Sequence, residues 1–109
     1  MHMGGNPMNQ AEFEAALKDG QSCFNYAVVH GICLSGADLQ EADLRQAHLS
    51  GANLKGAGIQ GANLREADIR GSNLQGADIR GSNLKAADLR GADLQGANLK
   101  DANLEDAHL

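Results

Sequence analysis

The sequence predicts an all-β protein, a quadrilateral parallel β-helix with a short α-helix over its N-terminal end. The first observation is a repeat of five residues that runs from Ser22 to Leu109 without insertion or deletion. The second is that the corner residues of this repeat recur after twenty residues, with two columns made only of glycine. The third is the composition, because 14 Gly, no Trp, one Tyr and two Phe suit a thin and regular interior.

Residues 1–8, MHMGGNPM, show no structural pattern, and we interpret them as a disordered lead-in or a cloning remnant. The N-terminus lacks a basic segment followed by an apolar run, and no stretch reaches the ~18 apolar residues of a membrane span. Cys23 and Cys33 fall half a coil apart in the geometry derived below, so we expect two free, outward-facing thiols. Together these features predict a cytoplasmic protein without membrane contact.

Residues 9–20 carry the signals of an N-terminal capping helix. Asn9 and Glu12 have the spacing of a capping box, and Gly20 supplies a stop signal. One helical face collects Phe13, Ala16 and Leu17. We therefore expect a helix over residues 10–18 whose apolar face closes the first coil.

Residues 21–109 form the repeat domain, in which each unit has an aliphatic or aromatic residue at its centre. The eighteen centres are Phe24, Val29, Leu34, Leu39, Leu44, Leu49, Leu54, Ile59, Leu64, Ile69, Leu74, Ile79, Leu84, Leu89, Leu94, Leu99, Leu104 and Leu109. In an α-helix, successive centres would be rotated by about 140° and would form no apolar face. In a straight strand, alternate centres would point to opposite faces. The remaining solution is a chain that turns by the same angle after each unit and points every centre inward.

The residues two places after each centre give the number of units in a coil. Two columns are pure glycine, namely Gly31, Gly51, Gly71 and Gly91, and Gly36, Gly56, Gly76 and Gly96. The other two are Tyr26, Gln46, Glu66, Ala86 and Asp106, and Glu41, Gly61, Gly81 and Asp101. Because the columns recur after four units, each coil is a square, and glycine suits corners with positive φ. The repeat domain then has about four and a half coils stacked ~4.8 Å apart.

The position two places before each centre is filled by Ala from Ala37 to Ala107, apart from Ser72 and Ser82. Runs such as Ala37-Asp38-Leu39, Ala62-Asn63-Leu64 and Ala92-Asp93-Leu94 resemble the pentapeptide-repeat family, and the resemblance covers residues 22–109. It implies a right-handed β-helix. The first units depart from the pattern, with Cys23, Val28 and Cys33 in place of Asp or Asn and Ile32 in place of Ala. We therefore expect the first coil to be distorted.

The C-terminal coil has no polar terminator, aromatic plug or second helix. Its centres are Leu94, Leu99, Leu104 and Leu109. An exposed rung of a β-helix invites another chain to pair with it. Either the natural polypeptide continues, or this coil stacks against a second copy. We favour a homodimer with these four leucines as the end-to-end interface, and the family resemblance implies the same kind of contact.

No catalytic residue, cofactor site or metal site is predicted. His48 and His108 are three coils apart, which is about 14 Å at the stacking rise, too far to share a metal. Asp68 and Asp88 lie one coil apart, but a flat wall offers no cleft for a catalytic pair. The glycines recur with the corners and precede no helix that could receive a phosphate.

The charges are mixed along the walls. The formal net charge is −5, and the repeat domain has 11 acidic and 8 basic residues, without the basic stripe of a nucleic-acid-binding protein. We expect a salt-bridge ladder of Arg45, Arg65, Lys85, Arg70 and Arg90 with Glu66, Asp68 and Asp88. We expect amide ladders of Asn63, Asn83 and Asn103, and of Asn53 and Asn73.

The function best supported by the sequence is a non-enzymatic structural or protein–protein interaction module whose partner is unknown. The alternative implied by the family resemblance is a DNA-mimicking inhibitor or protector of a type II topoisomerase, DNA gyrase. That alternative predicts a strongly negative rod, whereas these walls are mixed in sign. An enzyme has no supporting constellation of residues.

Overall fold

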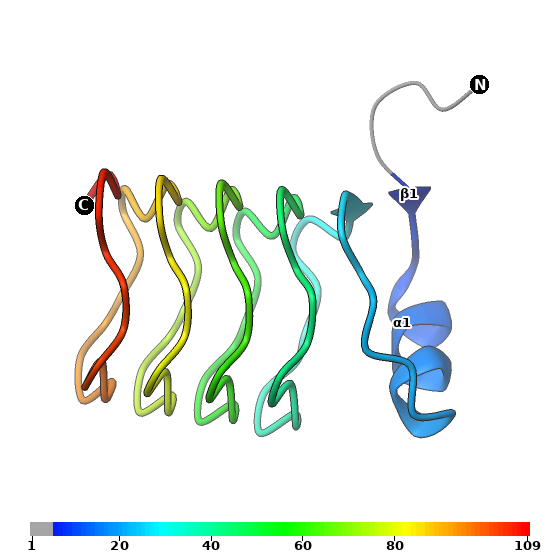
Figure 1. Ribbon diagram of the computed structural model, residues 1–109. Helices are drawn as coiled ribbons and strands as arrows, with labels where there is room; N and C mark the ends of the chain where they lie inside the picture. The colour runs from blue at the N-terminus through cyan, green and yellow to red at the C-terminus, as the bar shows by residue number, and fades with distance from the viewer. Residues whose placement is uncertain (1–5) are drawn as a thin grey trace.

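The structure, a computed structural model, describes residues 6–109. The coils stack along one axis, with helix α1 at one end and the C-terminus at the other (Figure 1). The Cα atoms extend over 34 × 26 × 21 Å, so the molecule is longer in one direction than in the other two. Within the described residues, no helix is both long enough and apolar enough to cross a membrane.

Helix α1 spans Gln10–Lys18, as predicted. Asn9 Oδ1 accepts from the Glu12 N–H at 2.8 Å, and Glu12 Oε1 accepts from the Asn9 N–H at 3.0 Å, which completes the capping box. The helix ends where Gly20 adopts a φ of +79°. The Gly20 and Gln21 N–H groups donate to the Leu17 and Ala16 carbonyls respectively, both at 3.0 Å, in the pattern of a Schellman motif.

The cap is attached by one apolar and one polar contact. Phe13 is fully buried, and its ring stacks on that of Phe24 with centroids 4.4 Å apart. The Gln10 carboxamide donates to the Cys33 carbonyl and accepts from the Cys33 N–H at 2.8 Å. A side-chain amide thus supplies the donor and acceptor that a preceding coil would have supplied from its backbone.

The chain before the helix also belongs to the cap. Strand β1, Asn6–Pro7, pairs in parallel with β2, Ala27–Val28, and the Met8 N–H donates to the Val28 carbonyl at 3.1 Å. The expectation of a disordered lead-in over residues 1–8 is therefore wrong for residues 6–8, because β2 offers unpaired backbone groups at the first coil. Residues 1–5 lie outside the described part.

Four hydrogen bonds per unit build the stack, as the unit centred on Leu64 illustrates. The Leu64 and Glu66 N–H groups donate to carbonyls of the following coil at 2.7 and 2.9 Å, and the Asn63 N–H donates to the preceding coil at 2.9 Å. The Ala67 N–H closes the turn onto the Leu64 carbonyl at 3.0 Å. Parallel bridges join residues twenty apart, such as Asn63 and Asn83, which confirms four units per coil.

Every corner has a positive φ, but glycine is not obligatory there. Ten corners are glycine, and seven are Tyr26, Glu41, Gln46, Glu66, Ala86, Asp101 and Asp106, with φ between 56° and 64°. A positive φ at the third turn position is the signature of a type II turn. A residue with a Cβ pays a strain of about 1–2 kcal/mol in this region, so these seven corners hold local strain.

The interior matches the expectation, and the first coil is more regular than expected. The core contains the centres from Phe24 to Leu89, together with the alanines beside them. Ser72 and Ser82 are buried, and their hydroxyls donate to the Ile69 and Ile79 carbonyls. Cys23, Val28 and Cys33 make the same bridges as Asp or Asn elsewhere, so the predicted distortion is wrong. The bridge uses only backbone atoms, and these side chains point outward.

Candidate interaction surfaces

The outer walls are built from the two residues that flank each centre. Since side chains alternate along an extended segment, the residues before and after an inward-facing centre both point outward on the same wall. Four sequence runs place Asp before the centre and Arg after it, at residues 43–45, 68–70, 78–80 and 88–90. In each run the Arg Nε to Asp Oδ1 distance is 2.8–2.9 Å, and the Nη2 to Oδ2 distance is 2.6–2.8 Å.

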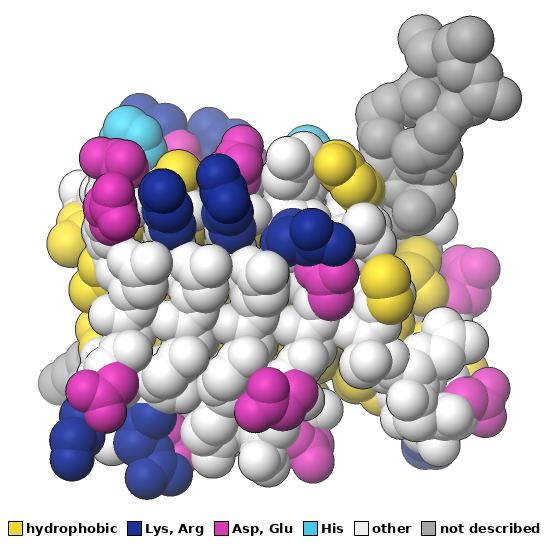
Figure 2. All heavy atoms as spheres, in the orientation of Figure 1, with side chains coloured by type: hydrophobic (Ala, Val, Ile, Leu, Met, Phe, Trp, Pro, Cys, Tyr) yellow, Lys and Arg dark blue, Asp and Glu magenta, His cyan; other side chains and the backbone are white. Residues whose placement is uncertain are grey.

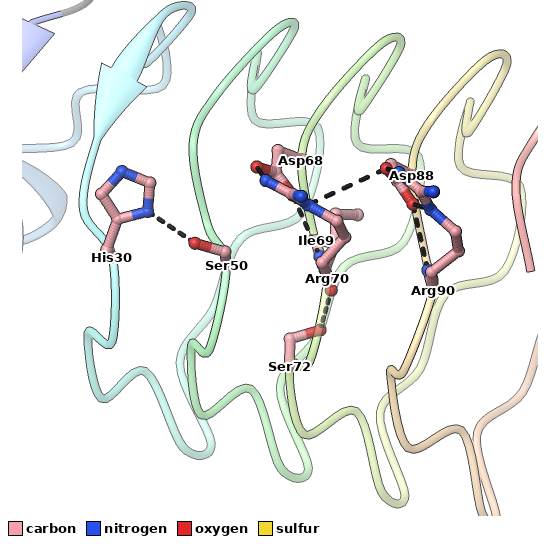
Figure 3. Close-up of polar contacts among 8 residues, drawn as sticks. All are labelled: His30, Ser50, Asp68, Ile69, Arg70, Ser72, Asp88 and Arg90. Carbon is pink, nitrogen blue, oxygen red and sulfur yellow. Dashed lines mark hydrogen bonds and ion pairs between the residues drawn. The ribbon is translucent and has the colours of Figure 1, made fainter.

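The forked pairs stabilise the ionised form of four aspartates on the walls. The side-chain hydrogen bonds from arginine lower the pKa of Asp43, Asp68 and Asp78, and the Arg90 guanidinium lowers the pKa of Asp88 to about 2. Between coils, Arg70 Nε lies 3.8 Å from Asp88 (Figure 3). The expected ladder therefore exists mainly as pairs within a coil, because residues two apart on one wall meet more closely than residues in successive coils.

Arg65 differs from the other four arginines of the chain. Asn63 stands where the other runs have Asp, and Asn63 Oδ1 accepts only the Arg65 backbone N–H, at 3.1 Å. Among residues 6–109, the sole ion pair of Arg65 joins its Nε to Glu66 Oε1 at 3.4 Å, without a fork. The Arg65 side chain is 51% exposed. Its guanidinium is thus the least engaged of the five.

The predicted amide ladders are not formed. The backbones of Asn63, Asn83 and Asn103 are bridged as expected, but each Oδ1 accepts the N–H of the residue two places later at 3.0–3.1 Å. Asn53 and Asn73 do the same. No hydrogen bond joins two Asn side chains in the described part of the chain, because the local turn takes each carboxamide oxygen first.

The corners of successive coils line up into four edges. Along one of them, which we call the side-chain edge, no corner residue is glycine. It consists of Tyr26, Gln46, Glu66, Ala86 and Asp106, all with positive φ. On one side lies a groove of about 340 Å³ lined by Asn25, Tyr26, Arg45, Gln46, Asn63, Arg65, Glu66 and Asn83. On the other lies one of about 370 Å³ lined by Tyr26, Gln46, His48, Glu66 and Asp68. Figure 2 shows a row of Lys and Arg side chains, with Asp and Glu among them, along the length of the prism.

The histidines build no chemical centre. His30 Nδ1 lies 2.6 Å from Ser50 Oγ (Figure 3), and the His30 and His48 rings meet edge to face at 5.7 Å. Within residues 6–109, no three His, Cys, Asp or Glu side chains gather in a way that could hold a metal. Cys23 and Cys33 are both exposed and unpaired.

The C-terminal coil presents an open rung. Leu94, Leu99 and Leu104 are only partly buried, Leu109 is 75% exposed, and hydrophobic side chains gather at this end in Figure 2. In the described structure, the N–H groups of these four leucines have no backbone acceptor, whereas the Leu84 and Leu89 N–H groups bond to the following coil. The four residues named from the sequence therefore share one rung. Whether that rung meets a second copy remains a proposal.

The comparisons identify the class of protein. The family model described as pentapeptide repeats matches in 8 copies over residues 32–71 and 72–109. The chain belongs to the pentapeptide-repeat family. No curated protein sequence matches it.

Two cyanobacterial crystal structures share the fold. The pentapeptide-repeat protein Rfr23 from Cyanothece 51142 is 27% identical over 94% of this chain and 63% of its own, with a TM-score of 0.78. HetL from Nostoc sp. strain PCC 7120, a protein involved in regulation of heterocyst differentiation, is 46% identical over 78% of this chain and 39% of its own, with a TM-score of 0.74. These matches confirm the right-handed quadrilateral β-helix.

A third match has a different described role. A trypsin-treated form of QnrB1, a plasmid-mediated fluoroquinolone resistance protein, is 28% identical over 78% of this chain and 47% of its own, with a TM-score of 0.55. This chain thus spans between about two fifths and three fifths of the length of the three proteins.

Proposed function

We propose that the protein is a non-enzymatic protein–protein interaction module that contacts its partner through the side-chain edge. The observation that carries this proposal is the run of five non-glycine corners with positive φ on one edge of the prism. Two other edges carry only glycine at their described corners, so the same turn forms there without strain.

The strain on this edge is large enough to need a reason. At about 1–2 kcal/mol for each residue, five such corners hold several kcal/mol, while a whole domain is stable by only about 5–15 kcal/mol. Strained residues cluster where a surface is used for binding. Glycine at these corners would remove both the strain and the side chains, so retention of the side chains points to contacts with another molecule.

The acids of the walls support a non-enzymatic role. A catalytic acid or base works best with a pKa near the operating pH. Here the forked arginines move the pKa of Asp43, Asp68, Asp78 and Asp88 in the opposite direction. Groups held this firmly as anions serve structure and recognition better than proton transfer.

A comparison of capture by three proteins tests the proposal. The edge variant carries Tyr26→Gly and Gln46→Gly, and it removes two side chains that line both grooves while relieving the strain of their positive φ. The control carries Gln75→Ser on the wall bounded by the two all-glycine edges. We expect the wild type and the control to retain one specific protein from a lysate of the source organism, and the edge variant to lose it. Equal capture by all three would show that the edge is not the contact surface.

We also propose a homodimer through the open rung of Leu94, Leu99, Leu104 and Leu109. The rung offers unpaired ladder groups and leucines that are not fully buried, and a twofold contact would cover the same groups on both copies. Sedimentation should show a concentration-dependent dimer for the wild type and a monomer for Leu109→Glu, which leaves the buried coils untouched because Leu109 is 75% exposed. A strictly monomeric wild type at high concentration would refute this pairing.

The DNA-mimic alternative comes from the resemblance to the pentapeptide-repeat family, and the similar structures include QnrB1, a fluoroquinolone resistance protein. A mimic needs a continuous negative surface, but four Asp carboxylates are each neutralised by an arginine two residues later. We therefore expect no inhibition in a DNA gyrase supercoiling assay with micromolar protein. Inhibition there would reverse the ranking of the two functions.

We further propose that the protein is cytoplasmic, because the exposed thiols of Cys23 and Cys33 would stay reduced in that compartment. Cell fractionation tests this proposal.

A further inference from the structure

We propose that Arg65 is the anchor of the interaction surface and that it receives a carboxylate side chain of an acidic protein segment. The inference rests on the proposed interaction function and names the chemistry of the partner. The other arginines already hold a carboxylate of this chain in a two-bond fork, and Arg65 alone has a single, longer contact to a carboxylate.

Arg65 lacks a fork because Asn, rather than Asp, stands two residues before it. Asn63 takes the place of the Asp that precedes Arg45, Arg70, Arg80 and Arg90 by two residues. Asn63 Oδ1 still accepts the backbone N–H of Arg65, so the turn is kept, but the carboxamide bears no charge to bind the guanidinium. The remaining contact to Glu66, at 3.4 Å, is a single longer one between half-exposed groups. Exposed pairs of this kind contribute ~0–1 kcal/mol, so an incoming carboxylate can displace it.

The neighbours of Arg65 favour an anion. Asn63 and Asn83 use their Oδ1 atoms in their own turns, and in the described part of the chain their Nδ2 donors have no partner. Lys85, on the same wall one coil later, reaches Glu105 only at 4.0 Å. The one carboxylate before Arg65 on this wall, that of Asp43, is occupied by the fork of Arg45. Apart from the Glu66 carboxylate, the groups beside Arg65 that have no partner are therefore donors.

The groove suits a protein segment better than a small free anion. It holds Tyr26, whose residue is 40% exposed, together with Gln46 and Arg65. Tyrosine and arginine are the residue types that most often dominate protein interfaces. The planar guanidinium matches a carboxylate with two parallel hydrogen bonds. An Asp or Glu side chain on a partner would engage Arg65 while its neighbours cover Tyr26.

The test uses an exchange of Asn and Asp at two matched sites. Asn63→Asp gives residues 63–65 the Asp before the centre and the Arg after it that the four forked runs share, and it should close the Arg65 fork without disturbing the fold. Asp78→Asn opens the fork of Arg80, whose ion pair in the described residues is with Asp78 alone. The probe is an acetylated, amidated hexaglutamate peptide, and the readout is the NMR shift of each arginine Nε–Hε group. Hexaglutamine and inorganic phosphate are the comparison ligands.

In the wild type, we expect a saturable shift at Arg65 with hexaglutamate and none with hexaglutamine. Asn63→Asp should weaken this binding by about tenfold or more, since it removes a charge-assisted bond from the complex. Asp78→Asn should add a response at Arg80. No shift at Arg65, an unchanged affinity in Asn63→Asp, or a silent Arg80 in Asp78→Asn would overturn the inference. Tighter binding of phosphate than of hexaglutamate would overturn the assignment of a protein carboxylate.

The two proposals can fail separately. If the edge variant loses the captured partner while Asn63→Asp retains it with wild-type affinity, the interaction function stands and the role of Arg65 is wrong. If hexaglutamate binds at Arg65 while the edge variant still captures the partner, the acidic-segment site stands and the side-chain edge is not the contact surface.

Discussion

Single residues in this protein are governed by their place in the five-residue unit, and the corner is the most demanding place. A corner residue needs a positive φ whether or not it is glycine, and seven non-glycine residues accept the strain. The flanking positions act as pairs, since Asp before a centre and Arg after it form a fork. Substitutions at corners and forks should therefore have effects that depend on position in the unit more than on exposure.

Ala86 offers the simplest test of corner strain, because its φ is +59° and its side chain is a single methyl group. Ala86→Gly should stabilise the fold by about 0.5–1 kcal/mol, the relieved strain less the extra freedom of glycine in the unfolded chain. Urea denaturation should show a higher midpoint with an unchanged slope. The matched control is Gly71→Ala, where a Cβ would meet no atom within 4 Å, so only φ matters. It should lower the midpoint, and a rise there would contradict the explanation.

The forks predict a loss of stability in acid. The folded pKa of Asp88 is about 2, while an unfolded Asp titrates near ~3.9. A depressed folded pKa means that the contribution is complete above about pH 4 and is lost as the pH falls toward about 2. Carboxyl NMR titration should place the Asp88 midpoint near 2. Asp88→Asn should have a flatter stability profile over this range than the wild type, and an equally steep profile would exclude the fork as the cause.

At the scale of elements, the cap pairs with the first coil through the same kinds of bond that join one coil to the next. The Gln10 carboxamide bonds to the Cys33 backbone, and β1 pairs with β2. Phe13 packs on Phe24 and closes the end of the apolar core. Helix α1 covers the first coil by these contacts, whereas the last described coil shows an open rung. The two ends of the described stack thus differ in whether their outward backbone groups are paired.

The cap predicts a graded series of variants. Phe13→Ala should cost about 3–5 kcal/mol because a fully buried ring is removed. Gln10→Leu should cost about 1 kcal/mol and should speed hydrogen exchange of the Cys33 amide. Gln10→Glu is the comparison variant: it keeps an acceptor for that amide, but it loses the donor to the Cys33 carbonyl and to Glu14 and adds a negative charge. Equal exchange rates of the Cys33 amide in Gln10→Leu and the wild type would show that the bond to Gln10 does not protect this amide.

At the scale of the whole molecule, stability should be close to a sum over adjacent coils, because each coil touches only its neighbours. The backbone bonds connect residues about twenty apart along the entire stack. The walls are straight and regular, so side chains twenty apart remain neighbours from one end to the other. This regularity lets a single substitution, such as Asn63 for Asp, create a local site without altering the frame.

Removal of one coil tests this additivity. Deletion of residues 52–71 joins Gly51 to Ser72, keeps every column in register and should give a folded rod with its stability reduced by about a quarter. Deletion of three residues, 52–54, breaks the repeat and should destabilise the protein far more. Circular dichroism and urea denaturation report both outcomes. Similar stability of the two deletions would mean that register does not govern the fold.

Much of the architecture could be predicted because it depends on intervals. The period of five residues predicted that the centres point inward, and the recurrence after twenty residues predicted four units in each square coil. The spacing of Asn9 and Glu12 predicted where α1 begins. The forks carried a readable signal as well, since residues two apart on an extended segment share a face. The predicted ladder between coils differs from this arrangement, because residues two apart on a wall approach more closely than residues twenty apart.

The sequence by itself determined the frame: a square tube, its lining of leucine and alanine, and the helix at its N-terminal end. Only the tertiary structure decided that residues 6–8 join the sheet, that seven non-glycine corners have a positive φ, and that Glu66 is the ion-pair partner of Arg65. The physical reason is that a repeat constrains backbone angles at regular intervals, whereas side-chain partners depend on distances in space. The bond of 2.6 Å within a coil prevails over the contact of 3.8 Å between coils.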